Sequence, residues 1–255
     1  MTEIDLSSYV PFELVVDSET GKIVKGAVEN PTYTTRKLFD MKEVIYDADW
    51  FANQKENLDL YYMYREFIRK EDHELFQKHK IRFDITIIPP RMLGREYVKT
   101  AGHFHPPVQK GKESFPEAYE VMHGKAVYLL QKETKKKKDP IEIIIIQAFA
   151  GDQVLIPPGY GHVTVNPTKD KLLVMNNLVS SEFSSRYEPI RKQKGAAYLY
   201  HANDTWIRNP TYHQRIIVRE KEPEKVAEKP FYLSFLKNPE KWKFLNEPWL
   251  KDKWC

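Results

Sequence analysis

The chain has 255 residues and a formal net charge of +4, from 40 Lys and Arg against 36 Asp and Glu. This near balance gives no support to a nucleic-acid-binding class, and 41% hydrophobic with 13% aromatic residues excludes a disordered chain. The length suits one large domain or one domain with appendages.

The cysteine content and the first residues point to one compartment. Cys255 is the only cysteine, so no disulfide can form within the chain, and a reducing compartment is expected. Residues 1–9 lack the apolar core of a signal peptide, and the apolar run around 143–146 is far shorter than a membrane-spanning helix of roughly 20 residues. We expect a soluble protein of the cytoplasm that binds neither nucleic acid nor membrane.

Residues 1–80 are expected to form strands and helices that pack on a barrel. Residues 12–16 alternate weakly in polarity, and Ser18-Glu19-Thr20-Gly21 predicts a turn. Residues 40–70 have a helical pattern, in which Asp40 could cap a first helix and 59–69 would form another. The apolar side chains near helical spacing in this second segment are Leu60, Met63, Tyr64 and Phe67.

Residues 81–213 have the pattern of short strands. Phe83, Ile85 and Ile87 alternate with Asp84 and Thr86. Further β-like runs are 96–100, 118–122, 126–131, 141–147, 154–156, 163–165 and 172–177. Four consecutive lysines at 135–138 indicate the solvated tip of a hairpin rather than an anion site. Short strands bounded by turn residues favour an antiparallel sandwich or barrel over a parallel sheet.

Residues 214–255 change character again. The segment 220–229 is charged and contains Pro223, and beyond it three tryptophans stand among lysines, at Trp242, Trp249 and Trp254. Tryptophan stabilises a fold mainly when it is buried. We therefore expect an aromatic-rich extension that packs back on the barrel or on another subunit.

Four residues form a candidate metal group: His103, His105, Glu117 and His162. Side chains alternate along a strand, so His103 and His105 project to the same side. The turn at Pro157-Pro158-Gly159 would direct His162 toward them. Three imidazoles and one carboxylate suit a divalent first-row transition metal and leave one or two coordination positions open, as in reactive metal sites.

Two alternatives bear on this group. A lone His-x-His pair is common on exposed strands, so the prediction depends on both segments together. Glu113 competes with Glu117 as the ligand because residues 106–116 must form a loop, whereas Glu117 opens a strand that ends at Gly124. Glu120 is expected to face outward. The histidines not expected to be ligands are His73, His79, His123, His201 and His213.

The two segments resemble the paired motifs of the cupin superfamily, a small antiparallel β-barrel with a metal in its mouth. Eleven residues separate His105 from Glu117. This is more than the general pattern has, and it resembles one branch, the cupin-type glucose-6-phosphate isomerases known mainly from archaea. The segments that resemble this branch, over about residues 11–212, are Pro11-Phe12, Val16-Asp17, Glu19-Thr20-Gly21, Arg36-Lys37-Leu38, Asp40-Met41, Thr100-Ala101-Gly102-His103-Phe104-His105, and Pro157-Pro158 with His162, Thr164, Val165 and Asn166.

The resemblance implies a cupin barrel that interconverts glucose 6-phosphate and fructose 6-phosphate in glycolysis and gluconeogenesis, as a homodimer with one Fe, Mn, Ni or Zn ion per chain. It implies that the four residues of the candidate group bind the metal and that Glu117 and Tyr119 are catalytic. Thr86, Thr100 and the backbone of Gly102 match positions that hold the phosphate. Tyr119 and Tyr187 match positions near the sugar.

Two positions depart from the branch: Ser185 stands where it has a histidine, and Gly159 where it has a tyrosine. These two departures favour an alternative function, that of a sugar-binding or regulatory cupin without turnover. A non-haem iron cupin oxygenase is a further alternative. For the isomerase, a cation across two adjacent oxygens would stabilise an enediol(ate) while Glu117 moves the proton. A metal-bound carboxylate is a weak base, however, so a metal-assisted hydride shift also stays open.

Overall fold

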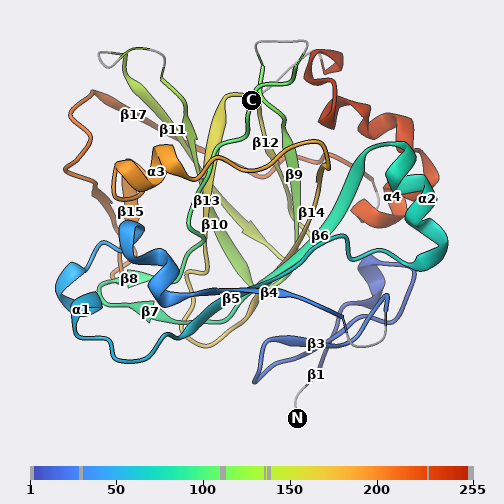
Figure 1. Ribbon diagram of the computed structural model, residues 1–255, viewed down its shortest axis with the longest axis horizontal. Helices are drawn as coiled ribbons and strands as arrows, with labels where there is room; N and C mark the ends of the chain where they lie inside the picture. Colours follow the sequence, from blue (N-terminus) through green and yellow to red (C-terminus); the bar gives the residue numbers. More distant parts are fainter. Residues whose placement is uncertain are drawn as a thin grey trace.

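Two β-sheets form the core of the computed structural model, which describes residues 3–28, 31–109, 113–134, 136, 139–228 and 230–251 (Figure 1). The larger sheet has the strand order β12 (Gln153–Ile156), β9 (Glu117–His123), β14 (Leu173–Ser180), β6 (Ile81–Ile88), β5 (Asp59–Tyr64) and β4 (Thr34–Lys37). The smaller has the order β13 (Tyr160–Val165), β10 (Lys125–Lys132), β11 (Ile141–Phe149) and β17 (Ile216–Lys221).

Neighbouring strands in both sheets are antiparallel except β11 and β17, which are parallel. The expected mainly β, antiparallel architecture is therefore confirmed. The pairing of β10 with β11 also confirms that residues 135–139 link two paired strands, although Lys135, Lys137 and Lys138 lie outside the described residues.

Smaller elements surround the two sheets. The remaining strands are β1 (Glu3–Asp5), β2 (Val15–Asp17) and β3 (Lys22–Lys25) in one sheet, β7 (Met92–Leu93) with β8 (Glu96–Tyr97), and β15 (Tyr198–Tyr200) with β16 (Trp206–Arg208). The α-helices are α1 (Ala48–Ala52), α2 (His73–Lys78), α3 (Glu188–Lys192) and α4 (Phe231–Lys237). The 3-10 helices are η1 (Ser7–Tyr9), η2 (Leu38–Val44), η3 (Lys70–Asp72), η4 (Pro239–Leu245) and η5 (Pro248–Leu250).

The larger sheet has two faces that bury different chemistry, because alternate residues of a strand project to opposite sides. On β6, Phe83 and Ile85 belong to an apolar cluster on the outer face, under α2 and α4. Arg82, Asp84 and Thr86 project to the inner face, toward the smaller sheet. This alternation is what places polar side chains in the interior between the two sheets.

The helical prediction for residues 59–69 is wrong, because residues 59–64 form strand β5. Its residues from Leu60 to Tyr64 are all buried, since Tyr61 and Met63 face inward while Tyr62 and Tyr64 pack in the outer cluster. A strand covered on both faces has a continuous apolar run, and such a run satisfies helical spacing as well. Upstream, Asp40 accepts a hydrogen bond from the Lys37 backbone N–H at the start of η2, at 3.0 Å.

The division at residues 80 and 213 remains a prediction, and strand pairs cross both boundaries: β5 pairs with β6, and β11 with β17. The extension packs back on its own chain, where Trp242 is fully buried and the rings of Tyr232 and Phe83 lie 4.9 Å apart. Trp254 lies outside the described residues. In the part of the chain that the structure describes, no helix has the length and apolarity to cross a bilayer.

Candidate metal centre

His103, His105, Glu117 and His162 converge between the two sheets, with one ligand atom from each inside a group whose members all lie within 4.8 Å of one another. Glu117 opens β9 and His162 lies on β13. The segment carrying His103 pairs with β13 as an isolated bridge, in which His103 and His162 exchange backbone hydrogen bonds of 3.3 and 3.0 Å. This bridge brings together two histidines that are distant in the sequence.

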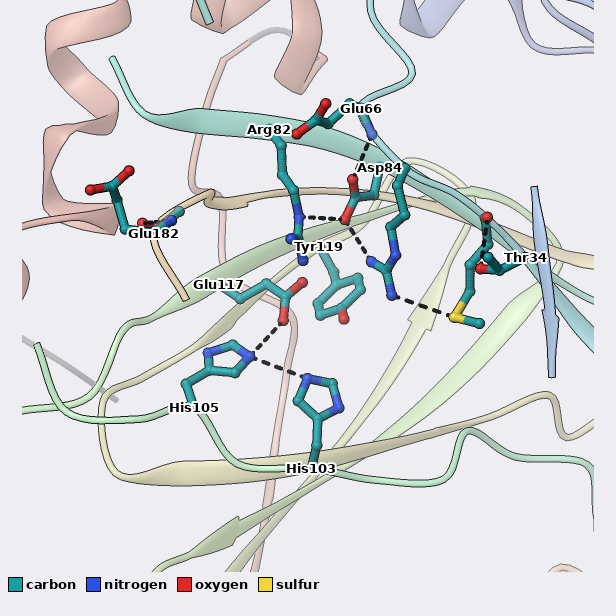
Figure 2. A network of polar contacts seen from close by, with 12 residues as sticks. Thr34, Glu66, Arg82, Asp84, His103, His105, Glu117, Tyr119 and Glu182 are labelled. Atoms are coloured by element: carbon teal, nitrogen blue, oxygen red, sulfur yellow. Dashed lines mark hydrogen bonds and ion pairs between the residues drawn. The ribbon is translucent and has the colours of Figure 1, made fainter. Parts of the chain in front are cut away.

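The hydrogen bonding of His105 fixes which of its ring nitrogens faces the other ligands. His105 Nδ1 lies 2.8 Å from the carbonyl oxygen of Phe115, which can only accept, so Nδ1 carries the proton and Nε2 presents a lone pair. That Nε2 lies 3.2 Å from His103 Nε2 and 3.3 Å from Glu117 Oε2 (Figure 2). His162 Nε2 lies 3.4 Å from the same carboxylate oxygen.

The donor atoms of this group converge on a common point. Glu117 Oε2 is buried and has no hydrogen-bond partner of good geometry among the described residues, although two imidazoles lie next to it. Ligands at about 2.0–2.2 Å from one ion stand roughly 3–4 Å from each other. The three distances above, 3.2, 3.3 and 3.4 Å, fall in this range. The group can therefore hold a divalent transition metal, and its donors have the chemistry that such an ion requires.

The electrostatics of the centre favour metal-binding protonation states. Burial lowers the pKa of His162 to about 4 despite the opposing charge of Glu117. Burial and the neighbouring imidazoles hold the pKa of His103 well below its usual range. Burial alone would raise the pKa of Glu117, but its contact with His105 and the charge of His162 outweigh burial and lower this pKa to about 2. At neutral pH, His103 and His162 are therefore neutral and the carboxylate is ionised.

The other expected site residues line the same cavity: Thr86, Thr100, Gly102, Tyr119 and Tyr187. At Gly102, φ is +74° and a Cβ atom would stand 2.6 Å from a methyl group of Val163, so only glycine fits there. The Tyr119 hydroxyl lies 3.1 Å from His162 Nε2, and the ring of Tyr187 lies 5.2 Å from that of His103. The structure thus places these residues around the candidate metal group.

The alternative carboxylates and the two positions that depart from the branch differ in whether they lie near the cavity. Glu113 is exposed and outside the group, and its carbonyl oxygen accepts a hydrogen bond from Val108 within the loop. Glu120 faces away from the cavity, as its position on β9 predicts. Ser185 lines the cavity, whereas Gly159 lies in a turn at φ +82°, where its N–H donates to Ser114 Oγ.

Sequence reasoning missed a polar cluster that lines the same cavity. Arg65 Nη1 and Arg82 Nε donate to Oδ2 of Asp84 at 2.6 and 2.9 Å, and Asp84 Oδ1 accepts from the backbone of Glu66 at 3.0 Å. The signal available was the alternation of Arg82, Asp84 and Thr86 on one face of a predicted strand. Arg65 had no such signal, because its segment has helical spacing.

Comparison with known proteins gives the family. The family model described as glucose-6-phosphate isomerase (GPI) matches residues 35–217, more than half of the chain. Glucose-6-phosphate isomerase of Thermococcus litoralis is 28% identical over 185 residues, which cover 72% of this chain and 85% of the relative. That of Pyrococcus furiosus is 30% identical over 165 residues, which cover 61% and 72%.

Solved structures give weaker similarity. Recombinant oxalate oxidase in complex with glycolate is 15% identical with a TM-score of 0.32, over 44% of this chain and 47% of that one. Oxalate decarboxylase of Bacillus subtilis, with Mn(II) centres, is 15% identical with a TM-score of 0.34, over 50% and 28%. The family assignment depends on the sequence matches: the chain belongs to the glucose-6-phosphate isomerase family.

Proposed function

We propose that this chain is a metal-dependent aldose–ketose isomerase that interconverts glucose 6-phosphate and fructose 6-phosphate. The observation that carries the proposal is the convergence of three imidazoles and one carboxylate in a cavity of a chain that belongs to this family. Most of the cavity's polar lining is uncharged or cationic, which suits a sugar phosphate.

His103, His105, Glu117 and His162 would hold one divalent ion per chain, and Fe, Mn, Ni and Zn all accept this donor set. Bound there, the ion would polarise a carbonyl oxygen and lower the cost of negative charge on the substrate. Because Nδ1 of His105 is fixed by the Phe115 carbonyl, its ring is already oriented for binding before the ion arrives.

The isomerisation removes a hydrogen from C2 of the aldose and delivers one to C1, while a proton moves between the two oxygens. The ionised carboxylate of Glu117 can take the C2 proton and return it to C1, which is general base and then general acid catalysis. Its low pKa makes it a weak base, so a direct hydride shift between the carbons remains the alternative. Burial raises the pKa of Tyr119 well above its usual range, so its hydroxyl stays protonated and can donate to a substrate oxygen.

The phosphate would bind near Thr86, Thr100 and the backbone N–H of Gly102. All three residues line the cavity, and hydroxyl and N–H donors orient a phosphate. Tyr187 would lie beside the sugar. The guanidinium groups of Arg36 and Arg191, each 5.5 Å from its ring centroid, support a fixed position for the ring.

We also propose a homodimer in the cytoplasm. The resemblance to the cupin-type isomerases supports the dimer, and the single cysteine supports a reducing compartment. Light scattering of the purified protein gives the mass in solution: twice that of the 30.2 kDa chain supports the dimer, and a single chain mass contradicts it.

The experiment combines metal analysis with a coupled assay that detects glucose 6-phosphate formed from fructose 6-phosphate. We expect about one ion per chain and turnover that a chelator removes, and His162→Ala should lose both. Binding of fructose 6-phosphate without turnover would instead support the non-catalytic alternative, for which the serine at Ser185 in the cavity is the supporting observation. Oxygen uptake would support the oxygenase.

A further inference from the structure

The register of the larger sheet places two arginines in the same cavity as Glu117. Arg82 on β6 is opposite Val179 on β14, which is opposite Glu117 on β9. Arg82 and Glu117 therefore occupy one row of the inner face, two strand spacings of about 4.8 Å apart. In Figure 2, the Arg82 side chain extends toward Glu117 and Tyr119. Arg65, which follows β5, lines the same cavity.

The charges of this cluster do not cancel. Asp84 is fully buried and is shared by both guanidinium groups through one oxygen, Oδ2. Two cations and one anion leave a net charge of +1 beside the candidate metal centre. The other oxygen of Asp84 accepts from the backbone of Glu66, which has a left-handed φ of 52°. Arg65 alone would neutralise Asp84, so the structural role of this carboxylate does not require Arg82.

Donors in this cluster remain available to a ligand. Within the described residues, Arg82 uses only Nε for a protein hydrogen bond, and its two terminal nitrogens have none. Nη2 of Arg65 contacts only the sulfur of Met63, at 3.4 Å, and a thioether is a weak acceptor. The shared carboxylate holds both guanidinium groups in position, so their free N–H groups are pre-organised.

The position of the cluster identifies the end of the ligand that it meets. Thr86, expected at the phosphate, and Arg82 are four residues apart on β6, about 13 Å. Glu117 shares the row of Arg82. A sugar phosphate with its phosphate near Thr86 would therefore present its C1 and C2 oxygens to the metal group and to the arginines together.

Resting on the proposed function, we propose that Arg65 and Arg82 form a guanidinium clamp that recognises negative charge at the C1–C2 end of the substrate. In the reaction, this charge is the enediolate that develops when the C2 proton leaves. A stable ligand that carries the same charge is a sugar phosphate with a carboxylate at C1, and the clamp should bind it. Fixed donors aimed at developing charge stabilise a transition state more than the neutral ground state.

The test compares two probes that differ only at C1: gluconate 6-phosphate, which has a carboxylate, and sorbitol 6-phosphate, which has a CH₂OH group. Calorimetry with the metal-loaded protein measures both. Arg82→Met should weaken the binding of gluconate 6-phosphate about tenfold or more, because a hydrogen bond to a charged group is lost. The same variant should change the affinity for sorbitol 6-phosphate by less than about twofold. Arg65→Met should act in the same direction, and Arg82→Lys should recover part of the loss.

Arg95→Met is the matched control, because Arg95 pairs with Asp47 at 3.0 Å outside the cavity. This variant should leave the affinity for both probes unchanged. If Arg82→Met and Arg65→Met reduced the affinity for both probes equally, or for neither, the proposed clamp would be wrong. In an active wild type, kcat should fall in Arg82→Met with little change in KM. A wild type without turnover would contradict the proposed function while the binding comparison still tests the clamp.

Discussion

Two buried carboxylates on one strand, Glu117 and Glu120, show what separates the two faces of the larger sheet. Glu117 meets imidazoles on the inner face, and their influence outweighs burial and lowers its pKa to about 2. Glu120 lies on the outer face, where burial raises its pKa although Asn176 and the backbone of Phe231 donate to it at 2.9 and 3.2 Å. Burial is common to both carboxylates, so the neighbouring imidazoles account for the opposite shift in the pKa of Glu117.

The outer carboxylate has a structural role. Both partners of Glu120 Oε2 are protein donors, one of them at the start of α4, and its neighbour Gln153 accepts from the backbone of Val226 and Ala227 at 2.8 and 2.7 Å. These contacts attach the extension to the outer face. Among the residues that the structure describes, no such partner reaches Glu117 Oε2, as expected of a group that completes its coordination with an ion.

Neutralising each carboxylate in turn should separate the roles of the two faces. Glu117→Gln should lower kcat by about 10²- to 10⁴-fold, because it removes a metal ligand and the proposed base, and it should reduce bound metal. Glu120→Gln should retain both activity and metal, since it lies on the other face. The coupled assay and metal analysis measure these effects. Comparable losses in the two variants would contradict the division of roles.

The role of the outer face can be tested through the extension. Trp242 is fully buried against the ring of Phe231, with centroids 4.9 Å apart. Trp242→Ala should lower the free energy of unfolding by about 3–5 kcal/mol in a denaturant titration. Trp249, which is 47% exposed, is the control, and its replacement by Ala should cost less than about 0.5 kcal/mol. Equal effects would show that the extension does not pack as described.

The inner face should make the metal-free protein sensitive to acid. The folded-state pKa of His162 is about 4, below its ordinary 6.5, because burial disfavours the charged ring. The unfolded chain therefore binds more protons between these values, and stability falls as pH drops from about 6.5 to 4, by about 3 kcal/mol from this residue. Chelator-treated His162→Gln should show a flatter profile in denaturant titrations across this range. If stability fell with pH equally steeply in the wild type and the variant, His162 would not be the cause of the acid sensitivity.

The smallest expected effect concerns the hydroxyl of Tyr119. Its pKa is raised by burial first and then by Glu117, so it acts as a donor and not as a base. Tyr119→Phe should lower kcat about tenfold, a loss of roughly 1.4 kcal/mol, and leave the metal in place. Unchanged kcat would place this hydroxyl outside the reaction.

Strand alternation predicted much of the inner face, because the period of two is a local property. It placed His103 with His105 and separated Glu117 from Glu120. It could not predict that β13 pairs with the segment around His103, since register between distant strands is set by tertiary packing. Arg65 was missed for a different reason: a strand buried on both faces has no polar alternation to distinguish it from a helix.

The extension shows a similar limit. Its tryptophans predicted packing, but they left open whether the partner was this chain or another subunit. The answer depends on the outer face of the sheet, where Phe83 packs against Tyr232 and Glu120 accepts a hydrogen bond from the backbone of Phe231. Contacts such as that of Asp72 with the hydroxyl of Tyr232, at 2.8 Å, join residues 160 positions apart.

We propose that one ion lies among the imidazoles of His103, His105 and His162 and the carboxylate of Glu117. Anomalous X-ray scattering from a metal-loaded crystal, recorded on both sides of the metal absorption edge, tests it most directly. We expect one strong peak within about 2.0–2.3 Å of the three Nε2 atoms and a carboxylate oxygen. A metal peak bound elsewhere, with these side chains turned away from one another, would contradict it.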